Sequence, residues 1–325
     1  MPVLVRKSLV LAKGEATEGT DSSPSASTDA LLVSAVAPSI NAEMIERDIL
    51  KQSLSSLGAI PGVRSMQVTF TTELRGRGAV PTAGSPLRDN PLFLAAGLSP
   101  TYATSSAVYR PTASPVSATI YVYLDGILVK MKGCYGNVEL VGEVGQFGRL
   151  NWTFQGVFDA IPSGVTAGDI RDEAFATATF DAFTLKPPTV LSASASVHTV
   201  TSLVIQALNV NMNNDVQQRP DISSANGIKS FFITGRRPSG TINPEAVTRG
   251  VVDFWKKWQD STEGVVSMQV GSVGAGNAVK IVGNAVQFGV PQWGERNNIR
   301  TFEVPTLYNA ASSAGDDEIE IQFLT

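Results

Sequence analysis

The side chains that could act as a nucleophile, a general base or a metal ligand are few and lie far apart in this sequence. Cys134 is the single cysteine and His198 the single histidine. A catalytic thiol needs a base beside it, and a metal-binding imidazole needs further ligands. The sequence shows neither near these residues, so we predict a buried structural thiol at Cys134 and a solvated or hydrogen-bonded strand residue at His198.

Two other segments have compositions that occur in binding sites. Residues 271–277, GSVGAGN, are rich in glycine, but they match neither the dinucleotide-binding fingerprint nor a phosphate-binding loop with its lysine. We predict a turn between strands there. The acidic group of Asp316, Asp317, Glu318 and Glu320 fits no metal-binding loop in its spacing. The sequence therefore predicts no catalytic residue, no cofactor and no metal site, and the protein is not expected to be an enzyme.

The composition limits the classes of partner. Charged residues make up only 17% of the chain and the net charge is −4, whereas proteins that hold nucleic acid carry a basic excess. A mildly acidic protein that meets DNA is suited to let it pass. A single cysteine excludes an intrachain disulfide, and no apolar run approaches the ~18 residues of a membrane-spanning helix. We expect no signal peptide and no membrane partner.

Alternating apolar and polar residues predict strands at 66–74, 149–158 and 317–324. Residues 118–133 add a hairpin, because Asp125-Gly126 separates two such runs. Each strand should turn its apolar face to a core and its polar face elsewhere. The three polar faces consist of Thr69, Thr71 and Glu73, of Asn151, Thr153 and Gln155, and of Glu318, Glu320 and Gln322.

Two segments carry helix signals. Residues 90–97 have an N-capping Asn, a Pro at the first helical position and a closing Gly. Residues 245–260 show one apolar stripe at helical spacing, and we expect Trp255 and Trp258 to lie in the core. Between the first helix and the hairpin, residues 98–118 are rich in Ser, Thr and Pro and are predicted to form a long loop.

The order of elements repeats along the chain. Each half has a strand, a basic glycine-containing break, a helix, a hairpin and a final strand, which predicts an internal duplication with domains at 1–190 and 191–325. Residues 14–29 form a polar N-terminal arm or loop. The basic breaks are at matched positions and contain Arg75, Arg77, Arg236 and Arg237.

Four motifs together resemble the tail tube proteins of long-tailed, siphovirus-like bacteriophages. They are VTFTTELRGRG at 68–78, SPLRDNPLFLAAGLS at 85–99, the hairpin and aromatic strand at 123–160, and GDDEIEIQF at 315–323. In that family a strand ending in E-L-R-G-x-G precedes a short helix, and an acidic strand closes the chain. Ala96 stands where many members have cysteine.

The resemblance implies a mainly β fold, with two tandem tail-tube-like β-barrel or sandwich domains, each flanked by a short α-helix. Subunits of the family join their sheets around a hollow lumen, and rings stack through an N-terminal arm and a long loop. Most rings are hexamers, but duplicated relatives form trimers with pseudo-sixfold symmetry, which the duplication favours here. Expected partners are further copies of the chain, a tape-measure protein, tail initiator and terminator proteins, and DNA in transit. The expected location is the virion tail, after assembly in the host cytoplasm.

In such a tube the nine polar-face residues are candidates for the lumen surface, where uncharged or acidic groups would not hold phosphate. A solvated outer sheet face is the alternative. We expect the four arginines, with Asp316 and Asp317, to form ion pairs between subunits rather than to bind DNA. Other functions of the same fold are a tail terminator, a baseplate hub ring, or a tube subunit of a bacterial contractile injection system.

Overall fold

The computed structural model is mainly β-sheet, as the sequence predicts, with two short helices among the described residues. It describes residues 3–53, 55–158, 161, 164–181, 184, 188, 194–201, 203–224, 226–271 and 277–324. The predicted domain boundary near residue 190 and the turn at 272–276 lie outside the described residues.

The elements of the first part of the chain are β1 Ser8–Gly14, β2 Ala30–Leu31, β3 Val33–Ile45, β4 Ile60–Glu73, α1 Asn90–Ala95, β5 Leu98–Tyr102, β6 Ser106–Pro111, β7 Ala118–Leu124, β8 Ile127–Glu143, β9 Arg149–Val157 and β10 Ile170–Asp172. Those of the second part are β11 Ser194–Val197, β12 Ile205–Asn211, β13 Asn214–Pro220, β14 Ile228–Arg236, β15 Ser239–Pro244, α2 Phe254–Gln259, β16 Glu263–Val270, β17 Ala278–Phe288, β18 Gln292–Arg296, β19 Ile299–Asn309 and β20 Glu320–Leu324.

The same order of strand pairing occurs in both parts. In the first part, antiparallel pairs link β1, β7, β8, β9, β4 and β3 in that order. In the second part, antiparallel pairs link β11, β16, β17, β19, β15 and β12. The chain visits the six positions in the same sequence each time, and its helix follows the strand in the fifth position. By this order β15 corresponds to β4, whereas the matched basic breaks predict that the counterpart is the strand ending at Arg236, which is β14.

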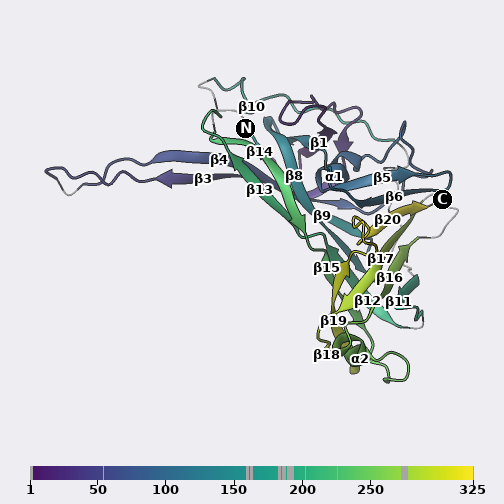
Figure 1. Cartoon of the computed structure of the whole chain (residues 1–325). Coiled ribbons are helices and arrows are strands. Elements are labelled where there is room, and N and C mark those ends of the chain that lie inside the picture. The colour runs from purple at the N-terminus through teal and green to yellow at the C-terminus, as the bar shows by residue number, and fades with distance from the viewer. Residues whose placement is uncertain are drawn as a thin grey trace.

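Two seams join the parts. β12 pairs with the end of β8, with Val210 opposite Leu140, so the two sheets continue into each other (Figure 1). The C-terminal strand β20 returns to the first part and pairs with β6, where Ile321 lies opposite Tyr109. Because both seams are backbone ladders, the two parts share one hydrogen-bonded sheet network.

The predicted strands around the first core are present, and their alternation decides which side chains are buried. Val68 and Phe70 of β4 are buried, as are Trp152 and Phe154 of β9, while the residues between them are partly exposed. Phe93 of α1 packs edge-on against Trp152, with 5.2 Å between ring centroids. The helix therefore closes the apolar side of the sheet and leaves the polar side open.

Both helices are shorter than predicted. α1 ends at Ala95, and its N-cap is Asp89 rather than Asn90. Residues 245–253 are not helical: β15 runs to Pro244, and α2 begins only after Asp253, whose side chain accepts a hydrogen bond from the backbone N–H of Lys256. This short helix does not bury Trp258, which is 41% exposed, so its predicted core position is wrong.

The predicted hairpin is β7 and β8. Asp125 and Gly126 both have positive φ angles, 42° and 104°, as a two-residue hairpin turn of the primed type requires. The loop predicted at 98–118 is wrong in part, because β5 and β6 form a second hairpin there. Their Ser, Thr and Pro content hides the strand pattern, while Ala107 and Tyr109 point into the core.

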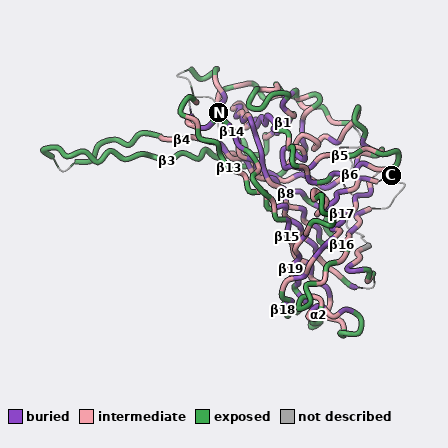
Figure 2. Tube along the Cα trace, in the orientation of Figure 1, coloured by how far each residue is buried: buried purple, intermediate pink, exposed green. Residues whose placement is uncertain are grey.

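The β3–β4 hairpin is the most prominent feature of the shape. Its outer part, residues 40–63, extends away from the body as an arm in Figure 1, and Figure 2 shows that this arm is exposed along its length. The hairpin formed by β13 and β14 has the same place in the second part, between β12 and β15, but lies along the body. The sequence did not predict the arm.

The polar segment 14–29, expected as an arm or loop, is a loop that packs on its own chain. Glu15 is buried and accepts hydrogen bonds from Ser117 Oγ (2.6 Å), Thr119 Oγ1 (2.7 Å) and the backbone N–H of Gly133 (2.8 Å). These donors satisfy a buried carboxylate. In the described chain, no helix is long and apolar enough to cross a membrane.

Candidate lumen and subunit-contact surfaces

A polar surface follows the face of the sheet opposite the core. In β4 and β9, Thr69 lies opposite Thr153 and Thr71 opposite Asn151. On the other side of β9, Asn151 lies opposite Glu139 of β8. Directly opposite residues in antiparallel strands point to the same side of the sheet. The structure therefore brings two of the three predicted polar faces together on one surface.

Side-chain hydrogen bonds cross the strands of this surface. Thr71 Oγ1 donates to Asn151 Oδ1 (2.9 Å), and Asn151 Nδ2 donates to Glu139 Oε2 (3.1 Å). At the β8–β12 seam, Asn137 Nδ2 donates to Asn211 Oδ1 (2.6 Å). The row of amides and hydroxyls thus continues from the first part of the chain into the second.

The residues of this surface on β8, β12 and β15 were not predicted from the sequence. Farther along it, Thr241 donates to Asn209 Oδ1 from both its hydroxyl (2.8 Å) and its backbone N–H (2.6 Å). The missed residues are Asn137, Glu139, Asn209, Asn211 and Thr241. Alternation with apolar residues in NVEL and LNVN was the available signal, but that signal does not say that β8 and β12 are neighbours.

One end of the surface is covered by the β13–β14 hairpin. Tyr135 lies opposite Gln155 in the β8–β9 ladder and forms a buried apolar cluster with Ile228 and Phe231 of β14. Val157 packs against the same cluster. The open part of the polar surface therefore lies toward the other end of β9, where Asn151 and Thr153 are partly exposed.

The third predicted polar face is not part of this surface. Glu320 belongs to β20 and is buried against Arg110 of β6, whose Nε and Nη2 donate to Glu320 Oε1 at 2.9 and 2.7 Å. Gln322 Nε2 also donates to Glu320, at 2.6 Å. Burial raises the pKa of Glu320, but the hydrogen bonds from Gln322 and Arg110 outweigh it and leave the pKa below its usual value. Glu318 lies beside this strand, bound to Arg236 as described below.

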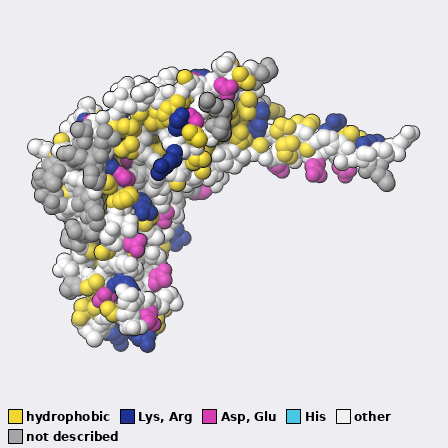
Figure 3. Space-filling view, turned by 180° about the vertical axis from the view of Figure 1, so that it is seen from behind, with side chains coloured by type: hydrophobic (Ala, Val, Ile, Leu, Met, Phe, Trp, Pro, Cys, Tyr) yellow, Lys and Arg dark blue, Asp and Glu magenta, His cyan; other side chains and the backbone are white. Residues whose placement is uncertain are grey.

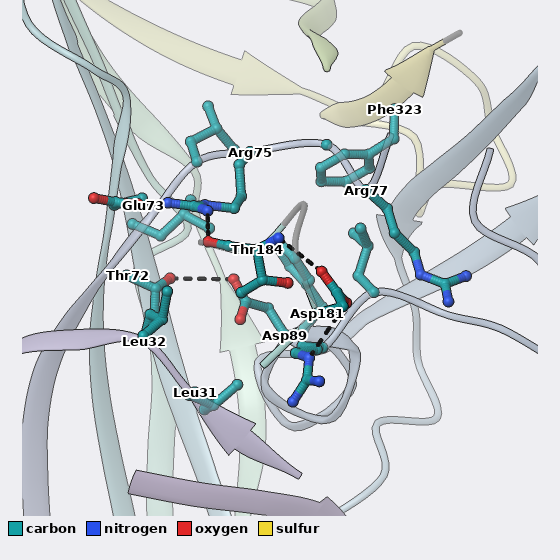
Figure 4. Close-up of a pocket in the computed structure, with 16 residues that line it drawn as sticks. Leu31, Leu32, Thr72, Glu73, Arg75, Arg77, Asp89, Asp181, Thr184 and Phe323 are labelled. Atoms are coloured by element: carbon teal, nitrogen blue, oxygen red, sulfur yellow. Dashed lines mark hydrogen bonds and ion pairs between the residues drawn. The ribbon is translucent and has the colours of Figure 1, made fainter. Parts of the chain in front are cut away.

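The basic break after β4 forms a pocket, shown in Figure 4. Arg75 forms an ion pair with Glu73 and donates to the carbonyl oxygen of Thr184. Arg77 donates to the carbonyl oxygen of Ser85 at 2.7 Å. Both guanidinium groups thus bind loops of their own chain, and burial lowers the pKa of Arg75. The cavity between them and the core is small, about 60 Å³.

Asp89, the N-cap of α1, lines this pocket. Its carboxyl accepts a hydrogen bond from Thr72 Oγ1 (3.2 Å), and Thr72 in turn accepts one from Trp152 Nε1 (2.9 Å). Burial raises the pKa of Asp89 to about 6, although Thr72, Arg75 and Arg88 oppose that shift. The Asp89 carboxyl therefore links the start of α1 to β4 of the sheet.

The second basic break also binds within the chain. Arg236 forms ion pairs with Asp316 and Glu318, the latter at 3.3 Å. Asp317 Oδ1 accepts a hydrogen bond from the backbone N–H of Ala311 (2.9 Å), whereas Arg237 is exposed. Asp316, predicted to meet an arginine of another subunit, therefore meets Arg236 of its own chain, whereas Asp317 binds a backbone N–H of the same loop.

The two residues considered for catalysis are packed structural groups. Cys134 is fully buried, and burial raises the pKa of its thiol well above the usual value, as predicted for a structural thiol. His198 stacks on Phe288 with 4.3 Å between ring centroids, and its Nε2 lies 2.9 Å from the carbonyl oxygen of Val286. Burial lowers its pKa. It sits in a turn with φ of 47° rather than in a strand.

Within the described residues, no group of three or more His, Cys, Asp or Glu side chains could hold a metal ion. The polar surface presents amide and hydroxyl groups and the carboxylate of Glu139, which hydrogen-bond to one another across the strands.

A comparison with protein-family models matches residues 6–323 to the phage tail tube protein family. No curated protein matches the chain. The match covers both strand-pairing units, the polar surface and the C-terminal strand β20 almost to its end. The chain therefore belongs to the phage tail tube protein family.

Proposed function

We propose that this chain is a structural tail tube subunit, which closes into rings that stack into a hollow tube for the passage of DNA. The continuous polar surface supports this proposal most directly. It crosses the seam between the two parts and has the core on its other side, as the inner wall of a barrel would. Its cross-strand hydrogen bonds join amide and hydroxyl groups, with Glu139 as the carboxylate among them.

The chemistry of the surface suits a conduit. Thr71 hydrogen-bonds to Asn151, and Asn137 hydrogen-bonds to Asn211, so neutral groups on this surface satisfy one another. Glu139 adds negative charge. DNA is held by cationic groups that displace its counterions. A neutral to acidic wall therefore lets the duplex move without binding it.

Two strand edges could close the ring. In the described residues, β3 pairs only with β4, and β18 pairs only with β19. Unpaired edges favour association with another strand. The β8–β12 seam already joins the corresponding strands inside the chain. β12 corresponds to β3 in the pairing order. β18 corresponds to the C-terminal end of β8, because it pairs with β19 next to β17. Pairing β3 with β18 of the next copy would repeat that seam.

The repeated pairing order supports a duplicated fold with units at 1–190 and 191–325. Three chains with two units each would then form a pseudo-sixfold ring, and a hexamer is the alternative. As a tube subunit the protein would be part of the virion tail, assembled in the host cytoplasm around a tape-measure protein between initiator and terminator complexes. It would have no enzymatic activity and no membrane partner.

Other roles within this fold are a tail terminator, a baseplate hub ring or a bacterial contractile-injection tube. A terminator or hub ring stops after one layer, whereas a tube subunit polymerises without a fixed length. The two-unit chain favours the phage tube over a single-unit injection tube.

Electron microscopy of the purified full chain, with mass photometry, tests the proposal. Hollow tubes, or rings with the mass of three chains, are expected. Rings of six chains would keep the function and remove the trimer. Single-layer rings that never stack, even with a tail initiator complex added, would favour the terminator or hub. A chain that stays monomeric at high concentration, also with an initiator complex, would contradict the proposal.

A further inference from the structure

The β13–β14 hairpin shows how a hairpin in this position binds a neighbouring unit. Ile228 and Phe231 of β14 are buried against Tyr135 of β8, on the polar side of the first sheet. At the base of the hairpin, Asn214 Nδ2 donates to the carbonyl oxygens of Ala96 (2.7 Å) and Gly136 (2.9 Å). The hairpin of the second unit is thus docked on the first unit.

The β3–β4 arm has the same position in the first unit. In each unit the hairpin extends from the last two strands of the pairing order. These are β4 and β3 in the first unit and β15 and β12 in the second. The β13–β14 hairpin finds a unit to dock on because the β8–β12 seam places the first unit beside it. The arm has no corresponding unit in a single chain, and it extends into solvent (Figure 1).

The arm exposes apolar side chains that a free surface hairpin does not need. Figure 3 shows hydrophobic side chains along the arm. Large apolar residues on it that are more than a third exposed are Ile40, Met44, Ile45, Ile49, Leu50, Leu57, Ile60 and Val63. Such a concentration of exposed apolar groups marks an interaction surface.

A second copy of the chain offers the matching surface. On the second unit, the counterparts of Tyr135 and Gln155 lie near Gln287 of β17 and Leu307 of β19, which are directly opposite each other. In the described chain these two side chains remain half-buried. α2 lies on the core side of these strands, where Phe254 packs on Phe288. No described hairpin covers them as β13–β14 covers Tyr135.

We propose that the β3–β4 arm docks on the second unit of the next copy within the same ring, across β17 and β19 at Gln287 and Leu307. It lies there as β13–β14 lies across β8 and β9 of its own chain. This inference rests on the proposed ring, and it assigns the arm to contacts around the ring rather than to contacts between stacked rings. The arm then buries its apolar side chains at every boundary between chains.

Cross-linking distinguishes arm contacts around one ring from arm contacts between stacked rings. The double variant Ile60→Cys with Gln287→Cys places one thiol on the arm and one on the proposed docking site, and the native Cys134 is buried. Assembled protein is treated with a short bismaleimide and run on a denaturing gel. Contacts around the ring are expected to give linked products that end at the copy number of the ring, because the last link closes the circle.

A ladder that continues beyond the ring copy number would show that the arm links stacked rings and would overturn the proposal. Rings that form without any linked product would overturn it as well. The control variant Ile60→Cys with Ser114→Cys carries its second thiol on an exposed loop and is expected to give no closed product.

A second pair of variants tests the apolar contact itself. Ile45 and Ile60 are opposite each other on the arm and are 56% and 54% exposed. Changing both to Lys should leave the isolated chain folded but reduce ring formation at a given concentration by at least tenfold. The matched control is Ile222→Lys on the exposed end of β13–β14, which should assemble normally. Normal assembly of the arm variant would contradict the docking. If the unmodified chain forms no rings or tubes at all, the proposed function fails first.

Discussion

Glu320 Oε1 accepts two hydrogen bonds from Arg110, from Nε at 2.9 Å and from Nη2 at 2.7 Å. The two residues are separated by 210 positions. They join the last strand of the chain to the first unit, beside the β6–β20 ladder. The C-terminal strand thereby closes the fold by a charged contact as well as by backbone pairing.

Arg110→Ala should destabilise the chain by about 1–2 kcal/mol. The carboxylate of Glu320 is mostly buried, and removing its charged partner leaves the cost of desolvation uncompensated, while partial exposure of Arg110 moderates the effect. Chemical denaturation at neutral pH measures it. Glu320→Gln should cost less, because the amide oxygen still accepts hydrogen bonds. An equal or larger loss for the Gln variant would contradict this account.

The Arg110–Glu320 pair also predicts how stability changes with pH in the acidic range. Because the pKa of Glu320 lies below its ordinary 4.5 in the folded chain, its contribution is complete above pH 4.5 and declines as the pH falls through the folded value. The wild type should therefore lose more stability than Glu320→Gln on acidification below pH 4.5. Parallel denaturation curves for the two proteins over this range would argue against it.

For Asp89 the expected pH dependence of stability has the opposite sign and lies at higher pH. Its folded pKa is about 6, above the ordinary 3.8, so the folded state binds a proton more strongly than the unfolded chain does. The wild type should lose stability as the pH rises from about 4 to about 6, by up to about 3 kcal/mol at 1.4 kcal/mol per pKa unit. Asp89→Asn should flatten this slope and keep the acceptor for Thr72. Parallel pH profiles of the free energy of unfolding for the wild type and Asp89→Asn would contradict this account.

Thr153→Lys tests the proposed lumen. Thr153 lies in the middle of the polar surface, between Thr69 and Asn137, and a cation there would face passing phosphates. Assembled tubes of this variant should retain DNA at low salt and release it as salt rises, which co-sedimentation measures. Ser114→Lys adds the same charge on an exposed loop and should not retain DNA. Equal DNA binding by both variants would remove Thr153 from the lumen.

Gly240→Ala tests the inner sheet. A Cβ at this position would overlap the carbonyl oxygen of Asn209 across the β12–β15 ladder. The strand shift that relieves this overlap should lower the free energy of unfolding by about 1–3 kcal/mol, as overpacking of a rigid site does. Gly84→Ala adds a methyl group with no atom within 4 Å and should be neutral. Thermal denaturation of both variants provides the comparison. Unchanged stability of Gly240→Ala would contradict the expectation that the β12–β15 ladder is rigid at this position.

The strands around the core could be predicted from the sequence because each carries its own signal. Trp152 and Phe154 alternate with polar residues, and Asp125-Gly126 marks a turn, so local pattern and final structure agree. The polar residues of β4 and β9 were found for the same reason. What a local pattern does not contain is which distant strands pair, so Asn209 and Thr241 were missed.

The arm and the late start of α2 escaped prediction for a different reason. Residues 40–63 expose most of their side chains, so no core imposes a clean alternation on them. At residues 245–260 the apolar stripe fits a helix, yet Glu245 bridges to Thr301 and Asp253 starts the helix late. Tertiary pairing there outweighed local propensity.

The β8–β12 seam has a consequence for the energetics of building a long filament. Each separate body that joins an assembly loses translational and rotational freedom, at a cost of roughly 4–15 kcal/mol. Two units tethered in one polypeptide lose that freedom relative to each other when the chain folds, before any partner is met. In the proposed three-chain ring, half of the boundaries are therefore already formed on arrival, so each layer of the filament needs three captures from solution instead of six.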